Sequence, residues 1–276
     1  MLINYGFEIA ILVPRATPVI CLLDVHPERR ADINFEAPFQ SEPTTRAHTY
    51  VDGFGNQCRR LMAPAGEISL TLAGTIVDSG VPDAVNPTVQ EVAVDALPDQ
   101  ALTYLLGSRY CETDRLSQVA WDMFGGMKPG WGRVQAISNF VHGHITFGYQ
   151  HARATRTALE AFEERKGVCR DFAHLMITFC RCLNIPARYV NGYLGDIGVP
   201  ADPAPMDFSA WTEVYLGDRW YTFDARHNKP RVGRIVVARG RDATDVPLLN
   251  TFGPHTLKTF KVWTDEHVPT ARAASA

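Results

Sequence analysis

Cys169 is the residue whose type and position in this sequence best fit nucleophilic chemistry. It follows Gly167 and Val168, and an apolar pattern at helical spacing begins at the cysteine itself. The first backbone N–H groups and the dipole of a helix stabilise a thiolate, so we expect the pKa of this thiol to lie below the free value of about 8.5. A small, inert core residue is the alternative, because free cysteine often has that role.

A predicted β-hairpin downstream carries polar residues that can serve a nucleophile. Segments 208–216 and 219–226 flank a Gly-Asp pair, which is typical of a two-residue hairpin loop. In that register Trp211 lies opposite Asp224, and both share one face of the hairpin with Ser209. A long side chain at position 209 would reach the Asp224 carboxylate, whereas a serine is too short. The hairpin therefore offers a carboxylate without a base beside it.

Several ordered motifs resemble those of the transglutaminase-like cysteine enzymes, over roughly residues 105–262. The matching pieces are Gly167-Val168-Cys169, Ile185-Pro186-Ala187-Arg188, Ala210-Trp211-Thr212-Glu213-Val214-Tyr215 and the strand from Trp220 to Asp224. The first hundred residues also look like the β-domain that precedes this core in bacterial members.

The resemblance implies both a fold and a set of roles. The expected fold is α+β, with an N-terminal antiparallel β-domain followed by a papain-like, transglutaminase-like core whose nucleophile helix packs on an antiparallel sheet. In such enzymes the cysteine, here Cys169, attacks an amide carbonyl. A histidine acts as general base and acid, and the aspartate, here Asp224, orients that histidine.

This sequence departs from the family pattern at the histidine, because Ser209 stands before Ala210-Trp211. A serine hydroxyl cannot take a proton from a thiol near neutral pH. His227 can replace the missing base only if the strand ends by Ala225 and the chain turns back, since an odd offset from Asp224 otherwise puts it on the opposite face.

Two further residues are candidates for substrate binding. Trp211 can cover the site or donate its indole N–H to an oxyanion, or it can simply fill the core. Arg226 begins a stretch rich in arginine, which suits a carboxylate or phosphate group or merely a solvated surface.

The remaining histidines do not predict a metal centre. His142 and His144 diverge by about 200° if they lie on a helix, so they cannot chelate together there. No third ligand stands at a recognisable spacing, and no loop has the acidic pattern of a calcium site. His174 lies about 140° around the helix from Cys169, so we expect it to make a structural hydrogen bond. We expect neither a metal nor a cofactor.

The elements that must position these groups follow from periodicity. Alternating apolar residues near the start of the chain and at 68–76 predict an N-terminal β-domain over residues 1–100. A proline-containing stretch without periodicity leads to a core at 101–265, and residues 266–276 are predicted to form a flexible tail. Within the core, apolar spacing predicts a helix from Cys169 to Leu183, ended by Asn184-Ile185-Pro186.

Composition excludes several classes of partner. The net charge of −3 and the pI near 6.3 argue against nucleic acid and anionic membranes. The N-terminal residues lack a basic lead and a cleavage site, so we expect a cytoplasmic protein. Six cysteines without C-x-x-C spacing predict reduced thiols. The sequence leaves the oligomeric state open.

Two functions from different classes fit these residues. In the first, the chain is a cysteine hydrolase or acyltransferase that opens an amide or peptide bond through a thioester on Cys169. In the second, it is a catalytically inactive module of the same fold that binds a peptide or small metabolite. The retained Cys169 and Asp224 favour the enzyme, whereas Ser209 favours the binding module.

Overall fold

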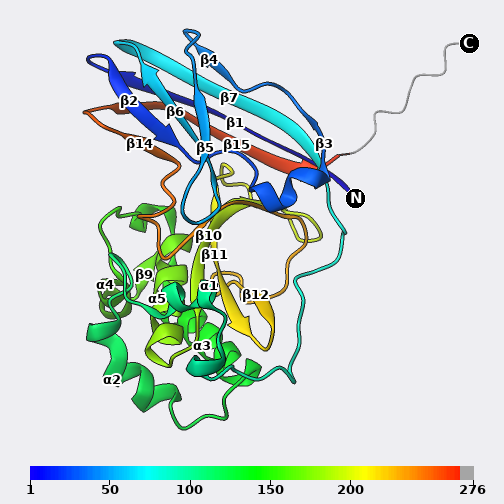
Figure 1. Cartoon of the computed structure of the whole chain (residues 1–276), viewed down its shortest axis with the longest axis vertical. Helices are drawn as coiled ribbons and strands as arrows, with labels where there is room; N and C mark the ends of the chain where they lie inside the picture. The colour runs from blue at the N-terminus through cyan, green and yellow to red at the C-terminus, as the bar shows by residue number, and fades with distance from the viewer. Residues whose placement is uncertain (268–276) are drawn as a thin grey trace, which may run out of the picture.

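The computed structural model describes residues 1–267 and confirms the α+β class (Figure 1). Strands at the top of Figure 1 form a β half, and the α-helices below gather around a separate sheet. Within residues 1–267, none of the helices combines the length and apolar character needed to cross a membrane.

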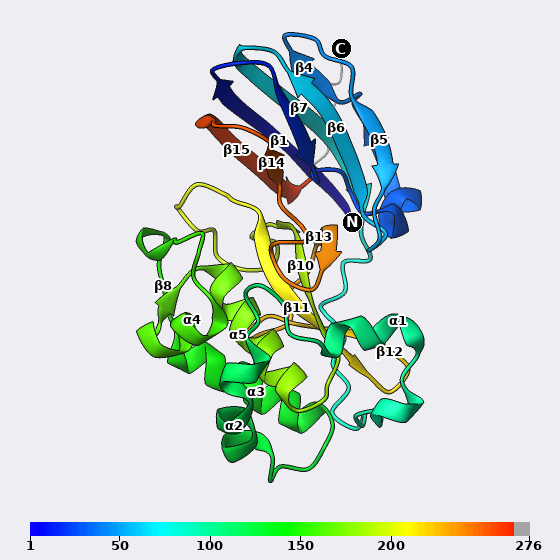
Figure 2. The same cartoon turned by 60° about the vertical axis from the view of Figure 1, so that its left-hand side comes forward.

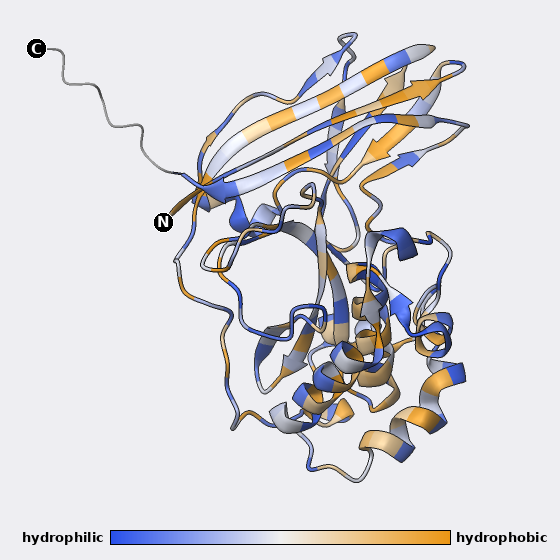
Figure 3. Cartoon of the chain, turned by 180° about the vertical axis from the view of Figure 1, so that it is seen from behind, coloured by the Kyte–Doolittle hydropathy of each residue, from blue (hydrophilic) through white to orange (hydrophobic). Residues whose placement is uncertain are grey.

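Two antiparallel sheets build the β half. One has the strand order β15-β1-β7-β3 with β4 also paired to β7, and the other has the order β14-β2-β6-β5. The bounds are β1 Leu2–Val13, β2 Thr17–Cys21, β3 Ile33–Glu36, β4 Gln40–Glu42, β5 His48–Val51, β6 Gln57–Ala63, β7 Gly66–Val77, β14 Leu249–Thr251 and β15 Thr256–Glu266, with a 3-10 helix, η1, at Pro27–Asp32. Apolar and polar residues alternate along the long strands, as Figure 3 shows, and every second residue of β7 is buried.

The last two strands return to the β half. β15 pairs antiparallel with β1, and β14 pairs with β2. The strand pairing therefore corrects the predicted grouping, in which residues 101–265 all belonged to the core. The physical reason is that these strands satisfy backbone groups along β1 and β2 that would otherwise face solvent as sheet edges. Most of the predicted tail, 266–276, lies outside the described residues.

The core sheet has the order β12-β11-β10-β13, and helix α5 packs against β10 and β11. Figure 2 shows the helices α2 to α5 gathered beside this sheet. The sheet strands are β10 Ala187–Leu194, β11 Ser209–Leu216, β12 Arg219–Phe223 and β13 Arg234–Gly240. The other elements are η2 Val94–Ala96, α1 Asp99–Leu102, η3 Thr103–Leu105, α2 Thr113–Phe124, α3 Trp131–His144, β8 Thr146–Phe147, η4 Tyr149–His151, α4 Ala158–Glu164, β9 Lys166–Gly167 and α5 Cys169–Cys182.

Helix α5 begins at Cys169, as predicted, because its first turn is fixed by a buried carboxylate. Asp171 accepts a hydrogen bond from the backbone N–H of Val168 at 2.8 Å and another from Arg156 at 3.1 Å. A Cβ on Gly167 would lie 2.5 Å from the same carboxylate, so only glycine fits there. The Gly-x-Cys spacing thus allows the chain to pass tightly over Asp171 before the helix starts.

The predicted hairpin of β11 and β12 is confirmed in its register, since Leu216 pairs with Arg219 and Thr212 pairs with Phe223. Strand β12 ends at Phe223, three residues before the end of the predicted segment 219–226 and one residue before Asp224. Asp224 therefore does not pair with Trp211 but begins a turn.

Candidate active site

Cys169 is the most accessible of six free cysteines. It is partly exposed at the start of α5, whereas the other five are buried. The remaining thiols therefore lack the access to solvent that a nucleophile needs.

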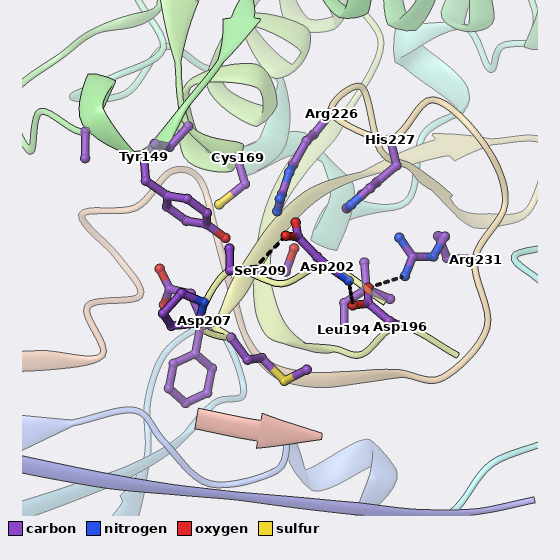
Figure 4. Close-up of a pocket in the computed structure, with 16 residues that line it drawn as sticks. Tyr149, Cys169, Leu194, Asp196, Asp202, Asp207, Ser209, Arg226, His227 and Arg231 are labelled. Atoms are coloured by element: carbon purple, nitrogen blue, oxygen red, sulfur yellow. Dashed lines mark hydrogen bonds and ion pairs between the residues drawn. The ribbon is translucent and has the colours of Figure 1, made fainter. Parts of the chain in front are cut away.

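A pocket above Cys169 collects side chains from several segments of the core (Figure 4). Its wall includes Tyr149 of η4, Asp207 from the loop before β11, Ser209 at the start of β11, and Arg226 and His227 from the turn after β12. Four of the predicted site residues, Cys169, Ser209, Arg226 and His227, thus lie around one pocket.

The turn after β12 places His227 against Asp224. Asp224 Oδ1 accepts the backbone N–H groups of Arg226 at 3.1 Å and His227 at 3.2 Å. Its other oxygen lies 2.8 Å from His227 Nδ1. Because a carboxylate only accepts, Nδ1 carries the proton and Nε2 is left as a basic nitrogen. This is the pairing of an orienting carboxylate with a general base.

Helix α3 supports this turn from outside the pocket. His142 Nδ1 lies 3.0 Å from the carbonyl oxygen of Ala225 and 3.1 Å from that of Arg226, so it donates to the turn. His144 instead contacts the carbonyl oxygen of Phe162 at 2.7 Å. The two histidines thus serve different backbone segments. No three His, Cys, Asp or Glu side chains among residues 1–267 gather as a metal site would require.

Arg234 of β13 binds the same oxygen of the Asp224 carboxylate as His227 does. Its Nη2 donates to Asp224 Oδ2 at 3.0 Å, and its Nε donates to Asp83 of the segment that joins the two halves at 2.9 Å. Burial by itself raises the pKa of Asp224, but the charge of Arg234 and the hydrogen bond from His227 hold that pKa well below its usual range. Asp224 is therefore an anion at any physiological pH.

Cys169 does not have the lowered pKa that its helical position predicts. Burial of the sulfur raises the pKa of the thiol to about 11, although the charge of Arg226 and the backbone N–H of Ala210 oppose the shift. The start of a helix lowers the pKa of a thiol, but the loss of solvent around the Cys169 sulfur raises that pKa by more. The resting residue is a thiol and needs a base to become a nucleophile.

Among the described residues, no hydrogen bond joins the Cys169 sulfur to the His227 ring. Figure 4 shows the Arg226 side chain between them, and the Arg226 guanidinium carbon lies 3.9 Å from the centroid of the Phe147 ring. The pocket thus contains a thiol and an imidazole, and the Asp224 carboxylate that orients the imidazole lies behind it, outside the pocket lining.

Ser209 and Trp211 lie on the same strand but in different surroundings. Ser209 lines the pocket, yet its hydroxyl is buried and has no hydrogen-bond partner among residues 1–267. Trp211 is 1% exposed, does not line this pocket, and packs under the guanidinium of Arg234 at 4.9 Å. It lies on the sheet face turned away from α5, because the neighbouring Thr212 contacts that helix at Ala173. The structure therefore does not bring Trp211 to Cys169.

His174 has the structural role predicted for it. The backbone N–H of Ala243 donates to His174 Nε2 at 3.1 Å, and burial lowers the pKa of the imidazole to about 3. A neutral ring in that place fixes the loop after β13.

Sequence reasoning missed four residues around the site: Asp83, His142, Tyr149 and Arg234. His142 was considered only as a metal ligand, and Arg234 only as part of a basic stretch. Asp83 meets Arg234 across 151 residues of sequence, so no local pattern signals the contact. The turn itself did carry a signal, because an aspartate often accepts backbone N–H groups two residues further on.

Comparison with known proteins agrees with the resemblance predicted from the motifs. Residues 117–225 match the model of the transglutaminase-like superfamily. That range contains Cys169, Ser209 and Asp224 but ends before Arg226 and His227.

Two relatives and one solved structure match a larger share of the chain than the family model does. An uncharacterized protein of Mycobacterium leprae is 26% identical over 211 residues, covering 74% of this chain and 75% of that protein. An uncharacterized protein of Mycobacterium tuberculosis is 28% identical over 146 residues, covering 50% of this chain and 46% of that protein. A crystal structure of a "Putative Cysteine Protease" from Cytophaga hutchinsonii has a TM-score of 0.83 and 28% identity, covering 96% of this chain and 90% of that one.

Proposed function

We propose that this chain, which belongs to the transglutaminase-like superfamily, is a cysteine hydrolase or acyltransferase that opens an amide or peptide bond, with His227 as the general base that Ser209 cannot provide. One observation carries the proposal: His227 Nδ1 is bound to Asp224 at 2.8 Å, and the ring faces the same pocket as Cys169. The solved relative described as a cysteine protease supports the same reaction class.

The reaction begins with deprotonation of Cys169. His227 Nε2 takes the thiol proton, through a bridging water or after the Arg226 side chain moves aside, and the sulfur attacks the carbonyl carbon of the substrate. A carbon–sulfur bond forms and the carbonyl becomes a tetrahedral oxyanion. The imidazolium, stabilised by Asp224, then gives its proton to the leaving nitrogen as the carbon–nitrogen bond breaks.

The second half of the reaction releases the acyl group. A water or an incoming amine loses a proton to His227 and attacks the thioester carbonyl. The carbon–sulfur bond breaks, and the thiolate recovers a proton from the imidazolium. Water gives a free acid and an amine gives a new amide, so product analysis with an added primary amine separates hydrolysis from transfer.

Acylation of Cys169 by 4-nitrophenyl acetate at pH 7 tests the proposal without knowledge of the natural substrate. We expect a burst of nitrophenolate together with an acetyl group on Cys169 by peptide mass spectrometry. His227→Gln should slow the burst by about 10²–10⁴, the usual contribution of a general base. Cys169→Ser supplies the background rate. Equal acylation of the parent and His227→Gln would remove His227 from the mechanism.

A binding module is the second candidate, and the raised pKa of Cys169 favours it. Burial raises that pKa to about 11, so a bare thiol in this pocket is almost entirely protonated at neutral pH. A peptide or metabolite bound over such a thiol would remain intact. This function predicts ligand-dependent stabilisation of the protein with no acyl group on Cys169 from any ester.

A further inference from the structure

Cys169 lies at the junction of two pockets that share a floor and have different outer walls. The first, here called the His227 pocket, combines apolar side chains with a group of charged and titratable ones, namely Asp196, Asp202, Arg226, His227 and Arg231. The second, here called the Leu248 groove, is lined largely by apolar side chains. These include Tyr189, Ala243, Val246, Pro247, Leu248 and Leu249. A substrate that places its carbonyl at Cys169 can therefore extend to both sides.

The position of His227 decides which part of a substrate enters which pocket. The acid that protonates the leaving nitrogen must lie on the leaving-group side of the carbonyl carbon. His227 does not line the Leu248 groove, whereas Cys169 lines both the groove and the His227 pocket. The leaving amine therefore occupies the His227 pocket, and the acyl group extends the other way.

From this geometry we infer that the Leu248 groove binds the acyl part of the substrate, and that this acyl part is an apolar chain or apolar side chain. The inference rests on the proposed function, because it assigns the two sides of the bond that Cys169 opens. It identifies the substrate class as amides of apolar acyl groups, with the polar portion of the molecule on the amine side.

The charged residues of the groove wall do not offer a site for an acidic acyl group, because its carboxylate, Asp207, would repel one and its two arginines are already engaged. Arg153 is paired with Glu160 at 2.8 Å and Glu164 at 2.9 Å. Arg170 donates to the backbone carbonyls of Ala154 and Arg153. With both guanidinium groups engaged, the groove recognises its ligand mainly by apolar contact.

The groove is held open by contacts to three other parts of the molecule. Val246 O accepts from Asn191 of β10 at 3.0 Å, and Leu248 O accepts from the backbone N–H of Leu22 in the β half at 3.2 Å. The start of the same segment is fixed by His174 through Ala243. An acyl chain thus binds against a pre-formed wall, so little binding free energy is lost in ordering that wall.

A series of 4-nitrophenyl esters tests the inference on the full chain. We expect the second-order rate of Cys169 acylation to rise from acetate through butyrate to hexanoate, by roughly fourfold for each methylene that the groove covers. Leu248→Ser removes part of the apolar wall and Ala243→Leu fills the groove, so each should flatten the series, measured as the ratio of the hexanoate rate to the acetate rate of the same variant. Leu257→Ser removes an exposed apolar side chain of β15 that lines neither pocket, and it should retain the parent series.

The outcomes separate failure of the groove assignment from failure of the proposed function. Acylation of Cys169 at the same rate by all three esters overturns the groove assignment and leaves the proposed function intact. A steep series that persists in both groove variants also overturns it, because the chain must then bind elsewhere. Absence of an acyl group on Cys169 with every ester overturns the proposed function and this inference with it. Thermal unfolding of each variant confirms that the rates come from folded protein.

Discussion

His227 Nδ1 lies 2.8 Å from Asp224 Oδ2, across a turn of three residues rather than across the strands of a hairpin. The family resemblance predicts a histidine at position 209, where β11 begins with a serine. In the proposed mechanism the base comes instead from the turn after β12, which holds both Asp224 and His227.

Under the proposed mechanism Asp224 acts on Cys169 only through His227, so the two residues should behave as one unit. Asp224→Asn and His227→Gln should each lower ester acylation of Cys169 by about 10²–10⁴. The double variant should be no slower than the slower single variant, since members of one catalytic unit are strongly non-additive. The measurement is the burst rate of the three variants and the parent, with His255→Gln as a distant control. Rates that multiply in the double variant would contradict the coupling.

The raised pKa of Cys169 predicts how its alkylation depends on pH. Since the pKa of the thiol is about 11, the thiolate fraction and the iodoacetamide rate should rise about tenfold per pH unit from pH 7 to 10. Labelling is followed by mass spectrometry of the Cys169 peptide. A plateau of the rate near pH 7 would show an activated thiolate and contradict the structural assignment.

Arg226 lowers the pKa of Cys169 against the larger effect of burial, so its removal should make the thiol less reactive. Arg226→Gln should slow Cys169 alkylation by roughly tenfold at pH 8, because loss of a nearby opposite charge disfavours the thiolate. Arg219→Gln is a matched control, since Arg219 is exposed and begins β12 beside the hairpin loop, at the far end of β11 from Ser209. Unchanged alkylation in Arg226→Gln would mean that the guanidinium does not act on the sulfur.

Arg234 is predicted to stabilise the fold by compensating the buried Asp224 anion. Arg234→Gln leaves that carboxylate without its cation and should cost about 3–5 kcal/mol. The folded-state pKa of Asp224 is depressed, so its contribution to stability is present above the unfolded pKa and is lost as pH falls through the folded pKa. At pH 4 the Asp224 carboxyl of the parent is still ionised, whereas in Arg234→Gln burial is opposed mainly by His227, so the pKa of the carboxyl rises and it takes up a proton near pH 4. The cost of the substitution should therefore be larger at pH 7 than at pH 4.

Urea unfolding of the parent and Arg234→Gln at both pH values measures this difference. Asp83→Asn is the matched variant, because it removes the ion pair between Asp83 and Arg234 but leaves the Arg234 guanidinium beside Asp224. It should cost less than Arg234→Gln. A cost for Arg234→Gln that does not change with pH would assign the loss to packing over Trp211 instead.

Local pattern was enough to predict the elements that carry the site. The apolar spacing from Phe172 to Leu183 and the Gly-Asp loop gave α5 and the hairpin with the correct start and register. The pattern could not give the chain path after Phe223, because hydrogen bonds to Asp224 end the strand there. It also could not give the pKa of Cys169, since burial of the sulfur depends on segments far away in sequence.

Ser209 is predicted to be dispensable for the proposed mechanism, in which His227 is the base. Its hydroxyl is buried without a hydrogen-bond partner among the described residues, so Ser209→Ala removes an uncompensated polar group. The variant should be as stable as the parent or more stable by up to about 1 kcal/mol, with unchanged ester acylation. A large loss of rate in a folded Ser209→Ala protein would instead give the hydroxyl a catalytic role.

The final prediction concerns an exchange of the histidine between the two positions. Ser209→His in the His227→Gln background places an imidazole on the strand beside Ala210, whose backbone N–H points at the Cys169 sulfur. If His227→Gln is slow because it lacks a base near this thiol, the double variant should be acylated at least about tenfold faster than His227→Gln. That gain is a part of the usual general-base contribution. Ser209→Gln in the same background is the matched control, because glutamine fills similar space without a titratable group. Recovery with glutamine would show that volume at position 209 matters rather than a base, whereas recovery with histidine alone would show that Cys169 accepts a base from either side of the pocket.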